Sequence, residues 1–105
     1  MLGKKIFYKN KILIYGLGLS GKSCFQYLSK KNIIHVFDDN SSLKNKKNKS
    51  NFLSKNKILK TEFDFIVLSP GIDIKKCKLN NYLLKNKNKI ITELDIFYLI
   101  FPENL

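Results

Sequence analysis

The feature that most constrains the fold is a glycine-rich turn that follows the first apolar run. Residues 11–15, Lys-Ile-Leu-Ile-Tyr, have the short apolar character of a strand that is buried on both faces of a parallel sheet. The turn Gly16-Leu17-Gly18-Leu19-Ser20-Gly21 comes next, and residues 21–32 then place apolar side chains at helical spacing. A strand, a G-x-G-x-x-G turn and a helix in this order are typical of domains that bind the diphosphate of a nucleotide-linked ligand.

Each glycine of this turn has an expected physical role. Gly16 allows the tight turn, Gly18 lets the backbone approach a pyrophosphate, and Gly21 lets the helix pack on the sheet. The N-terminus of the helix then offers backbone N–H groups to the anion. Asp38 ends the next apolar run, residues 33–37, where dinucleotide-binding enzymes place an acid on a ribose hydroxyl. The alternatives are glycines that serve packing alone and an Asp38 that merely ends a strand in solvent.

The same segment also matches a second nucleotide-binding pattern. Residues 16–23 satisfy G-x-x-x-x-G-K-[ST], the Walker A motif of P-loop nucleotide triphosphatases. Such a site also needs a magnesium-holding Asp, commonly at the end of another apolar strand, but residues 65–68 are followed by Ser69-Pro70-Gly71. We therefore expect Lys22 to be a solvated or phosphate-facing cation, and we expect neither a metal site nor a catalytic residue in this chain.

The rest of the sequence alternates further strands and helices, expected in turn at residues 63–68, 79–87, 89–92 and 94–101. Residues 40–60 are rich in Lys, Asn and Ser. They fit either a short helix with a weak strand near Ile58-Leu59 or a mobile surface loop. The order of elements predicts a single α/β domain over residues 1–105, with a Rossmann-like parallel sheet of about five strands flanked by helices.

Composition limits the partners of such a domain. The formal net charge is +12, but every basic residue is Lys, and the abundance of Lys, Asn, Ile and Phe is typical of AT-rich coding sequence. Arg, the usual bidentate contact to guanine and phosphate, does not occur, so we expect no nucleic-acid partner. No apolar run reaches about 18 residues and no signal-peptide pattern occurs, so we expect no membrane association. Cys24 and Cys77 fit neither a metal site nor a disulfide framework, which predicts a cytoplasmic location.

Four segments, in this order and combination, resemble the N-terminal domain of the MurD family, the UDP-N-acetylmuramoylalanine-D-glutamate ligases. They are Ile14 to Ser23, the strand end Asp38-Asp39, Ile66-Val67-Leu68-Ser69-Pro70-Gly71-Ile72, and Thr92-Glu93-Leu94-Asp95-Ile96-Phe97. The family is implied to have three domains, for the UDP-linked substrate, for ATP and for D-glutamate. The resemblance covers the first of these, so we expect the central ATPase and C-terminal domains to be absent.

The resemblance also implies a UDP site. By similarity, the backbone N–H groups of Leu19 and Ser20 would bind the diphosphate, and the Leu19 side chain and Gly71 would flank the uracil. Members often carry Thr-Arg after the strand-end acid, whereas this chain has Asp39-Asn40, which removes a cation and adds an acid near the nucleotide. The expected site comprises Gly16, Gly18, Leu19, Ser20, Gly21, Asp38, Asp39, Asn40, Ser69, Pro70 and Gly71.

The implied function is binding of the UDP moiety of UDP-N-acetylmuramoyl-L-alanine during peptidoglycan synthesis. In the full-length enzyme, ATP and magnesium would activate this substrate as an acyl phosphate, which the amine of D-glutamate would attack. The present domain is expected to bind no cofactor itself and to meet D-glutamate only through the absent domains. A stand-alone NAD-binding domain and a small P-loop triphosphatase are the alternatives, and a generic dinucleotide fold does not require the Ser69-Pro70-Gly71-Ile72 turn.

Overall fold

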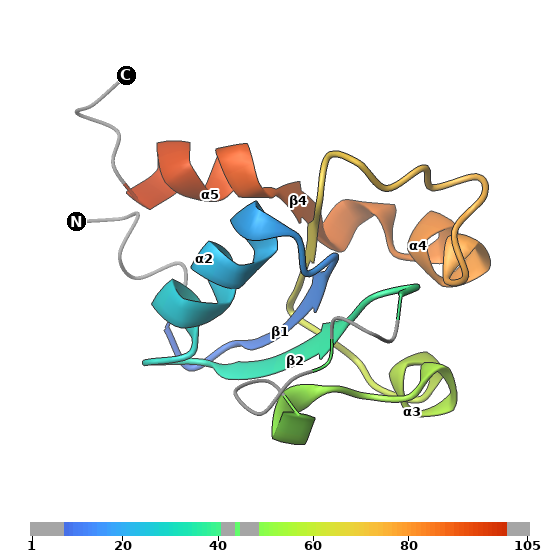
Figure 1. Cartoon of the computed structure of the whole chain (residues 1–105), viewed down its shortest axis with the longest axis horizontal. Helices are drawn as coiled ribbons and strands as arrows, with labels where there is room; N and C mark the ends of the chain where they lie inside the picture. The colour runs from blue at the N-terminus through green and yellow to red at the C-terminus, as the bar shows by residue number, and fades with distance from the viewer. Residues whose placement is uncertain (1–7, 41–43, 45–48, 101–105) are drawn as a thin grey trace.

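A computed structural model describes residues 8–40, 44 and 49–100, without the side chains of residues 19–20 and 97–100. Strands and helices alternate along these residues (Figure 1). The elements in order are β1 (Lys11–Tyr15), α2 (Leu19–Leu28), β2 (Ile33–Phe37), the 3₁₀ helix η2 (Lys49–Asn51), α3 (Lys55–Leu59), β3 (Phe65–Leu68), α4 (Asn80–Lys85), the 3₁₀ helix η3 (Lys87–Lys89), β4 (Ile90–Thr92) and α5 (Glu93–Ile100).

The four strands form one sheet in the order β2-β1-β3-β4, and every pair is parallel. In the register of the sheet, Tyr15 at the end of β1 lies opposite Phe37 of β2 and Leu68 of β3. Because the strands are parallel, the segments that leave their carboxyl ends emerge at the same edge of the sheet. This edge, called the carboxyl edge below, receives every residue of the expected site.

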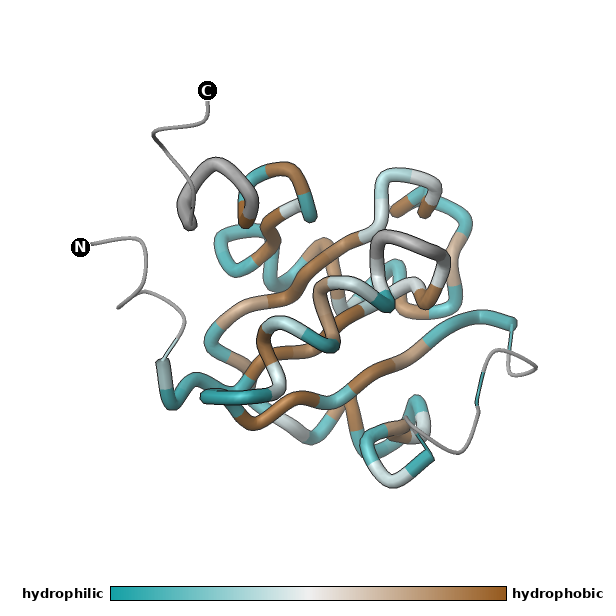
Figure 2. Tube along the Cα trace, turned by 60° about the vertical axis from the view of Figure 1, so that its left-hand side comes forward, coloured by the Kyte–Doolittle hydropathy of each residue, from teal (hydrophilic) through white to brown (hydrophobic). Residues whose placement is uncertain are grey.

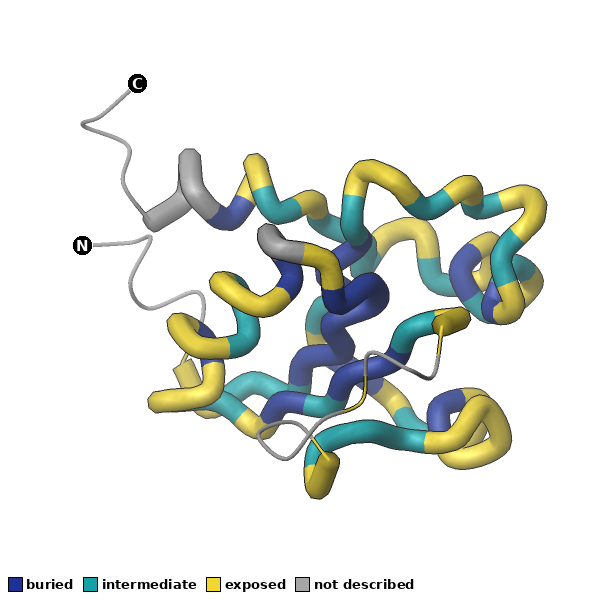
Figure 3. Tube along the Cα trace, viewed as in Figure 1, coloured by how far each residue is buried: buried dark blue, intermediate teal, exposed yellow. Residues whose placement is uncertain are grey.

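Apolar side chains cover both faces of the sheet, as expected for parallel strands with helices on either side. The two faces carry separate clusters because successive side chains of β1 alternate, with Ile12 and Ile14 in one cluster and Leu13 and Tyr15 in the other. Helices α2 and α5 supply Leu28 and Ile96 to the first cluster, whereas α3 and α4 cover the second. Figure 2 shows the hydrophobic strands at the centre of the chain, and Figure 3 shows that the buried residues concentrate there.

Among the described residues the sheet has four strands rather than the expected five or so, because residues 58–59 are helical. The Ser54 hydroxyl caps α3 by accepting a 3.3 Å hydrogen bond from the Lys57 N–H, and Ile58 is fully buried from this helix. The place beside β2 is occupied instead by a single parallel bridge between Val36 and Phe52. The polar Lys- and Asn-rich segment offers too few apolar side chains to extend this bridge into a strand.

Helix boundaries differ from the expected ones by a few residues. Helix α2 begins at Leu19 rather than at residue 21 and ends at Leu28, so the glycine turn is shorter than the sequence suggested. The helix expected at residues 79–87 is divided between α4 and η3. Asn86 separates the two pieces, and its side-chain amide donates a 2.8 Å hydrogen bond to the Tyr82 carbonyl, which ends the first piece.

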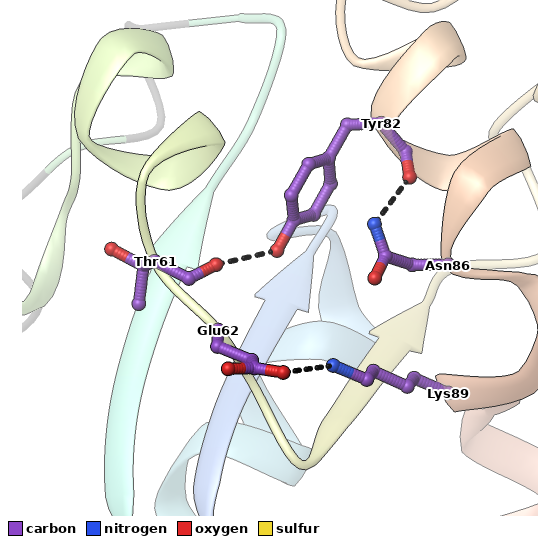
Figure 4. A network of polar contacts seen from close by, with 5 residues as sticks. All are labelled: Thr61, Glu62, Tyr82, Asn86 and Lys89. Carbon is purple, nitrogen blue, oxygen red and sulfur yellow. Dashed lines mark hydrogen bonds and ion pairs between the residues drawn. The ribbon is translucent and has the colours of Figure 1, made fainter.

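Polar contacts at the opposite edge of the sheet connect the segment before β3 to α4 and η3 (Figure 4). The Tyr82 hydroxyl donates a 2.9 Å hydrogen bond to the Thr61 carbonyl, and Lys89 lies 3.7 Å from the exposed carboxylate of Glu62. Burial raises the pKa of Tyr82, and the nearby Glu62 charge raises it further. The tyrosine contact therefore stabilises this edge as a neutral hydrogen bond, while an exposed ion pair adds at most about 1 kcal/mol.

Candidate functional site

The connections that leave β1, β2 and β3 pack against one another at the carboxyl edge. The Gly16 N–H donates a 2.9 Å hydrogen bond to the Phe37 carbonyl, and the Ser69 N–H donates a 3.1 Å hydrogen bond to the Tyr15 carbonyl. The glycine turn therefore lies between the residues after β2 and the residues after β3. The three segments that contain the expected site residues are brought together here.

Two of the three glycines are required by contacts within the protein. Gly16 has a φ of 107°, which L side chains rarely adopt, and a Cβ there would lie 2.5 Å from the Ser69 Cβ. Gly21 is buried in the first turn of α2, and its Cβ would lie 2.0 Å from the Gly16 carbonyl oxygen. The expected roles of Gly16 in a tight turn and of Gly21 in helix packing are consistent with this geometry.

Gly18 differs from the other two because nothing lies within 4 Å of the position that its Cβ would occupy. It is the exposed N-cap of α2, which has no side-chain cap hydrogen bond and no acidic residue in its first turn. The first N–H groups of a helix lack intrahelical acceptors, and they carry partial positive charge. The backbone of Leu19 and Ser20 begins this helix, so an anion can approach these N–H groups over Gly18.

Asp38 holds the glycine turn through one carboxylate oxygen and the backbone after β2 through the other. Oδ2 accepts a 2.7 Å hydrogen bond from the Leu17 N–H, and Oδ1 accepts a 2.8 Å hydrogen bond from the Asn40 N–H. Charge-assisted bonds of this kind are stronger than neutral ones. Asp38 therefore fixes both the glycine turn, at Leu17, and the backbone directly after β2, at Asn40. Each oxygen keeps a further lone pair, so Asp38 can still accept a hydrogen bond from a ribose hydroxyl.

Asp39 is directed into contacts that the sequence did not indicate. Its Oδ1 accepts a 2.5 Å hydrogen bond from the Tyr15 hydroxyl, and its Oδ2 accepts a 3.3 Å hydrogen bond from the Lys78 N–H. The Lys78 ammonium also donates a 3.0 Å hydrogen bond to the Asp39 carbonyl. Tyr15 was expected only as the last residue of a buried strand, and no motif marked Lys78.

The residues after β3 form a short turn at this edge. The Ile72 N–H donates a 3.1 Å hydrogen bond to the Ser69 carbonyl, which leaves Pro70 and Gly71 exposed at the tip. Nothing lies within 4 Å of the position that a Gly71 Cβ would occupy. Asn40, the last residue of the expected site, is exposed beyond the Asp38 contact. These positions leave open space on the solvent side of the turn.

The geometry of the glycine turn favours a Rossmann-type site over a Walker A loop. Helix α2 begins at Leu19, so Gly21 and Lys22 are already helical and only residues 16–18 separate β1 from the helix. A P-loop instead wraps a longer glycine-rich segment around the phosphates before its helix starts. Lys22 is exposed on the first turn, as expected for a solvated or phosphate-facing cation. Among the residues that the structure describes, no group of three potential metal ligands occurs.

The ionisable side chains behind the turn are not set up for nucleophilic chemistry. Burial and, to a smaller extent, the charge of Glu93 raise the pKa of the Cys24 thiol to about 11. The thiolate, which is the reactive form, is therefore scarce near neutral pH. The Glu93 Oε1 atom lies 3.8 Å from the position that a Gly21 Cβ would occupy, which places the start of α5 against the start of α2.

The parallel sheet, the helices on both faces and the glycine turn at the start of α2 define a Rossmann-like α/β domain with its site at the carboxyl edge. Residues 10–92 match the family model described as Mur ligase MurD-like, N-terminal domain. The chain belongs to this family, which links it to the ligases of peptidoglycan synthesis. Comparison with curated proteins and with solved structures found no match. Within the described residues, no helix has the length and apolar character needed to cross a membrane.

Proposed function

We propose that this domain binds the UDP moiety of UDP-N-acetylmuramoyl-L-alanine, as the N-terminal domain of the ligase that adds D-glutamate. Family membership carries the proposal, because residues 10–92 match a MurD-like N-terminal domain and include every residue of the expected site. We also propose that the protein acts in the cytoplasm. In the whole enzyme, ATP, magnesium and D-glutamate would bind to other domains.

The geometry supports specific roles for the site residues. The diphosphate would lie over Gly18, where the start of α2 is open and the backbone N–H groups of Leu19 and Ser20 come first in the helix. Asp38 would accept a hydrogen bond from the ribose while it continues to hold the turn. The uracil would lie against Gly71, which has free space on its solvent side.

The main alternative is a domain that binds NAD, since the glycine turn and Asp38 suit either diphosphate. The residues after β3 distinguish the two hypotheses. The Ser69-Pro70-Gly71 turn is bonded directly to the end of β1, so a uracil-binding wall would stand at a fixed distance from the diphosphate. A dinucleotide that extends along the carboxyl edge would not need this wall.

Titration of the chain with UDP and with NAD, followed by chemical-shift mapping of backbone amides, tests the proposal. We expect UDP to bind more tightly and to shift both Gly18 and Gly71. Gly18→Val should weaken binding without unfolding the chain, because the new side chain would enter open space and block the approach of the diphosphate. Tighter NAD binding, with a shift at Asp38 and none at Gly71, would instead favour the redox hypothesis.

A further inference from the structure

The carboxyl edge contains a buried hydroxyl group that neither the glycine turn nor the resemblance accounts for. Tyr15 is fully buried, and its ring packs edge-on against Phe37 with centroids 5.5 Å apart. The hydroxyl reaches the solvent side of the core and meets the carboxylate of Asp39 at 2.5 Å. An exposed acid is thus bonded directly to the core of the sheet.

The Tyr15 hydroxyl stays protonated and therefore acts as a hydrogen-bond donor. Burial holds the pKa of Tyr15 far above its usual range, and its hydrogen bonds to Asp39 and to the Cys77 thiol raise it further. Tyr15 therefore keeps its proton at any physiological pH. The Asp39 carboxylate accepts the hydrogen bond from the Tyr15 hydroxyl. Such a charge-assisted bond is stronger than one between neutral groups.

The position of Asp39 explains why such a restraint matters to a site for an anion. Asp39 follows Asp38, whose carboxylate already bonds the Leu17 N–H inside the glycine turn. A second carboxylate free to move at the next residue would bring negative charge toward the start of α2 and repel a diphosphate there. The Tyr15 and Lys78 contacts instead hold it toward the segment that precedes α4.

We propose that Tyr15 is a positioning residue of the nucleotide site, whose hydroxyl holds the Asp39 carboxylate against the Lys78 segment and away from the diphosphate. This inference rests on the proposed function. Asp39 then does not contact the ligand, although the resemblance implied that it lies near the nucleotide. The same contact restrains the residue before Asn40, so Asn40 also stays near the nucleotide.

The test compares UDP binding by wild type, Tyr15→Phe, Asp39→Asn and the double variant, at ionic strengths of about 0.01 M and about 1 M. Tyr82→Phe is the matched control, because it also removes a tyrosine hydroxyl hydrogen bond but lies at the opposite edge of the sheet (Figure 4). Thermal unfolding of each variant separates loss of affinity from loss of stability.

We expect Tyr15→Phe to weaken UDP binding about fivefold at low salt, the size of one unit-charge repulsion in a largely solvated site. Most of this loss should disappear at high salt, where the freed Asp39 charge is screened, and also in the double variant, where that charge is absent. Asp39→Asn alone should change the affinity by less than about twofold, and Tyr82→Phe should leave it unchanged. A merely structural role for Tyr15 would give neither the salt dependence nor the recovery.

Several results would overturn the inference. One is a Tyr15→Phe variant with the same UDP affinity and salt dependence as wild type. Another is a double variant that loses as much UDP affinity as Tyr15→Phe alone. If Tyr15→Phe does not fold, the exposed Asp39→Asn variant still decides, because a large loss of affinity there would make Asp39 a direct ligand contact. If wild type itself fails to bind UDP, the proposed function is rejected. If wild type binds UDP and only the variants behave otherwise than expected, the role of Tyr15 alone is rejected.

Discussion

Replacement of Gly21 by Ala should destabilise the domain, although alanine is the better helix former. The new Cβ would lie 2.0 Å from the Gly16 carbonyl oxygen, a backbone atom that no side-chain rotation can move away. Overpacking of this kind costs up to about 3 kcal/mol, since helix α2 must shift from the sheet to relieve it. The intrinsic gain of Ala over Gly in a helix offsets about 1 kcal/mol. The net loss is therefore up to about 2 kcal/mol, which should lower the melting temperature by up to about 8–16 °C.

Gly18→Ala is the matched control, because it makes the same chemical change three residues earlier in the same turn. Nothing lies within 4 Å of its Cβ position, and its φ of −66° suits any residue. Loss of a glycine N-cap should cost less than about 1 kcal/mol. Thermal unfolding followed by circular dichroism compares the two variants. Equal melting temperatures would refute the argument that Gly21 is fixed by contact with Gly16.

Two further predictions concern charge. Lys22→Ala should leave the fold intact and weaken UDP binding only a few-fold, because an exposed ammonium is screened by solvent. Titration of this variant with UDP and with ATP checks the prediction. Complete loss of ATP binding would support a Walker A site. Burial lowers the pKa of His35; a backbone hydrogen bond with Asn51 opposes this shift, and the Lys11 charge reinforces it. The unfolded chain then binds the proton more readily, so the contribution of His35 to stability is present above the unfolded pKa of about 6.5 and is lost as the pH falls below it. His35→Gln should therefore show a smaller drop in melting temperature between pH 7.5 and pH 5 than wild type, and an unchanged drop would count against this reasoning.

The sheet could be predicted from the sequence because each strand is a short apolar run that ends at a punctuating residue. Strand β1 ends directly before Gly16 and β3 ends directly before Ser69-Pro70, and both boundaries lie where they were expected from the sequence. The crossover between β2 and β3 could not be predicted in the same way. Ile58 and Leu59 are adjacent apolar residues that suit a strand, and only the Ser54 cap and the single buried position of Ile58 make them helical.

The site could be predicted in part for a related reason. A glycine pattern encodes backbone geometry, so the sequence correctly located the turn and the acid after β2. The direction of a side chain depends instead on contacts between distant segments. Asp38 and Asp39 are chemically identical neighbours, yet one bonds the Leu17 N–H and the other bonds the buried Tyr15 hydroxyl. Nothing local in the sequence distinguishes these two acids.

The hydrogen bonds that join the three connections at the carboxyl edge also affect the cost of binding. The end of β1 is bonded on both sides, because the Gly16 N–H donates to the Phe37 carbonyl and the Tyr15 carbonyl accepts from the Ser69 N–H, and Asp38 fastens the glycine turn a second time. A ligand that binds there meets a preorganised surface and need not order a loop, whose immobilisation costs about 0.5–1.5 kcal/mol for each rotamer-rich side chain. More of the contact energy with a diphosphate can therefore appear as affinity, and association does not have to wait for a slow conformational change.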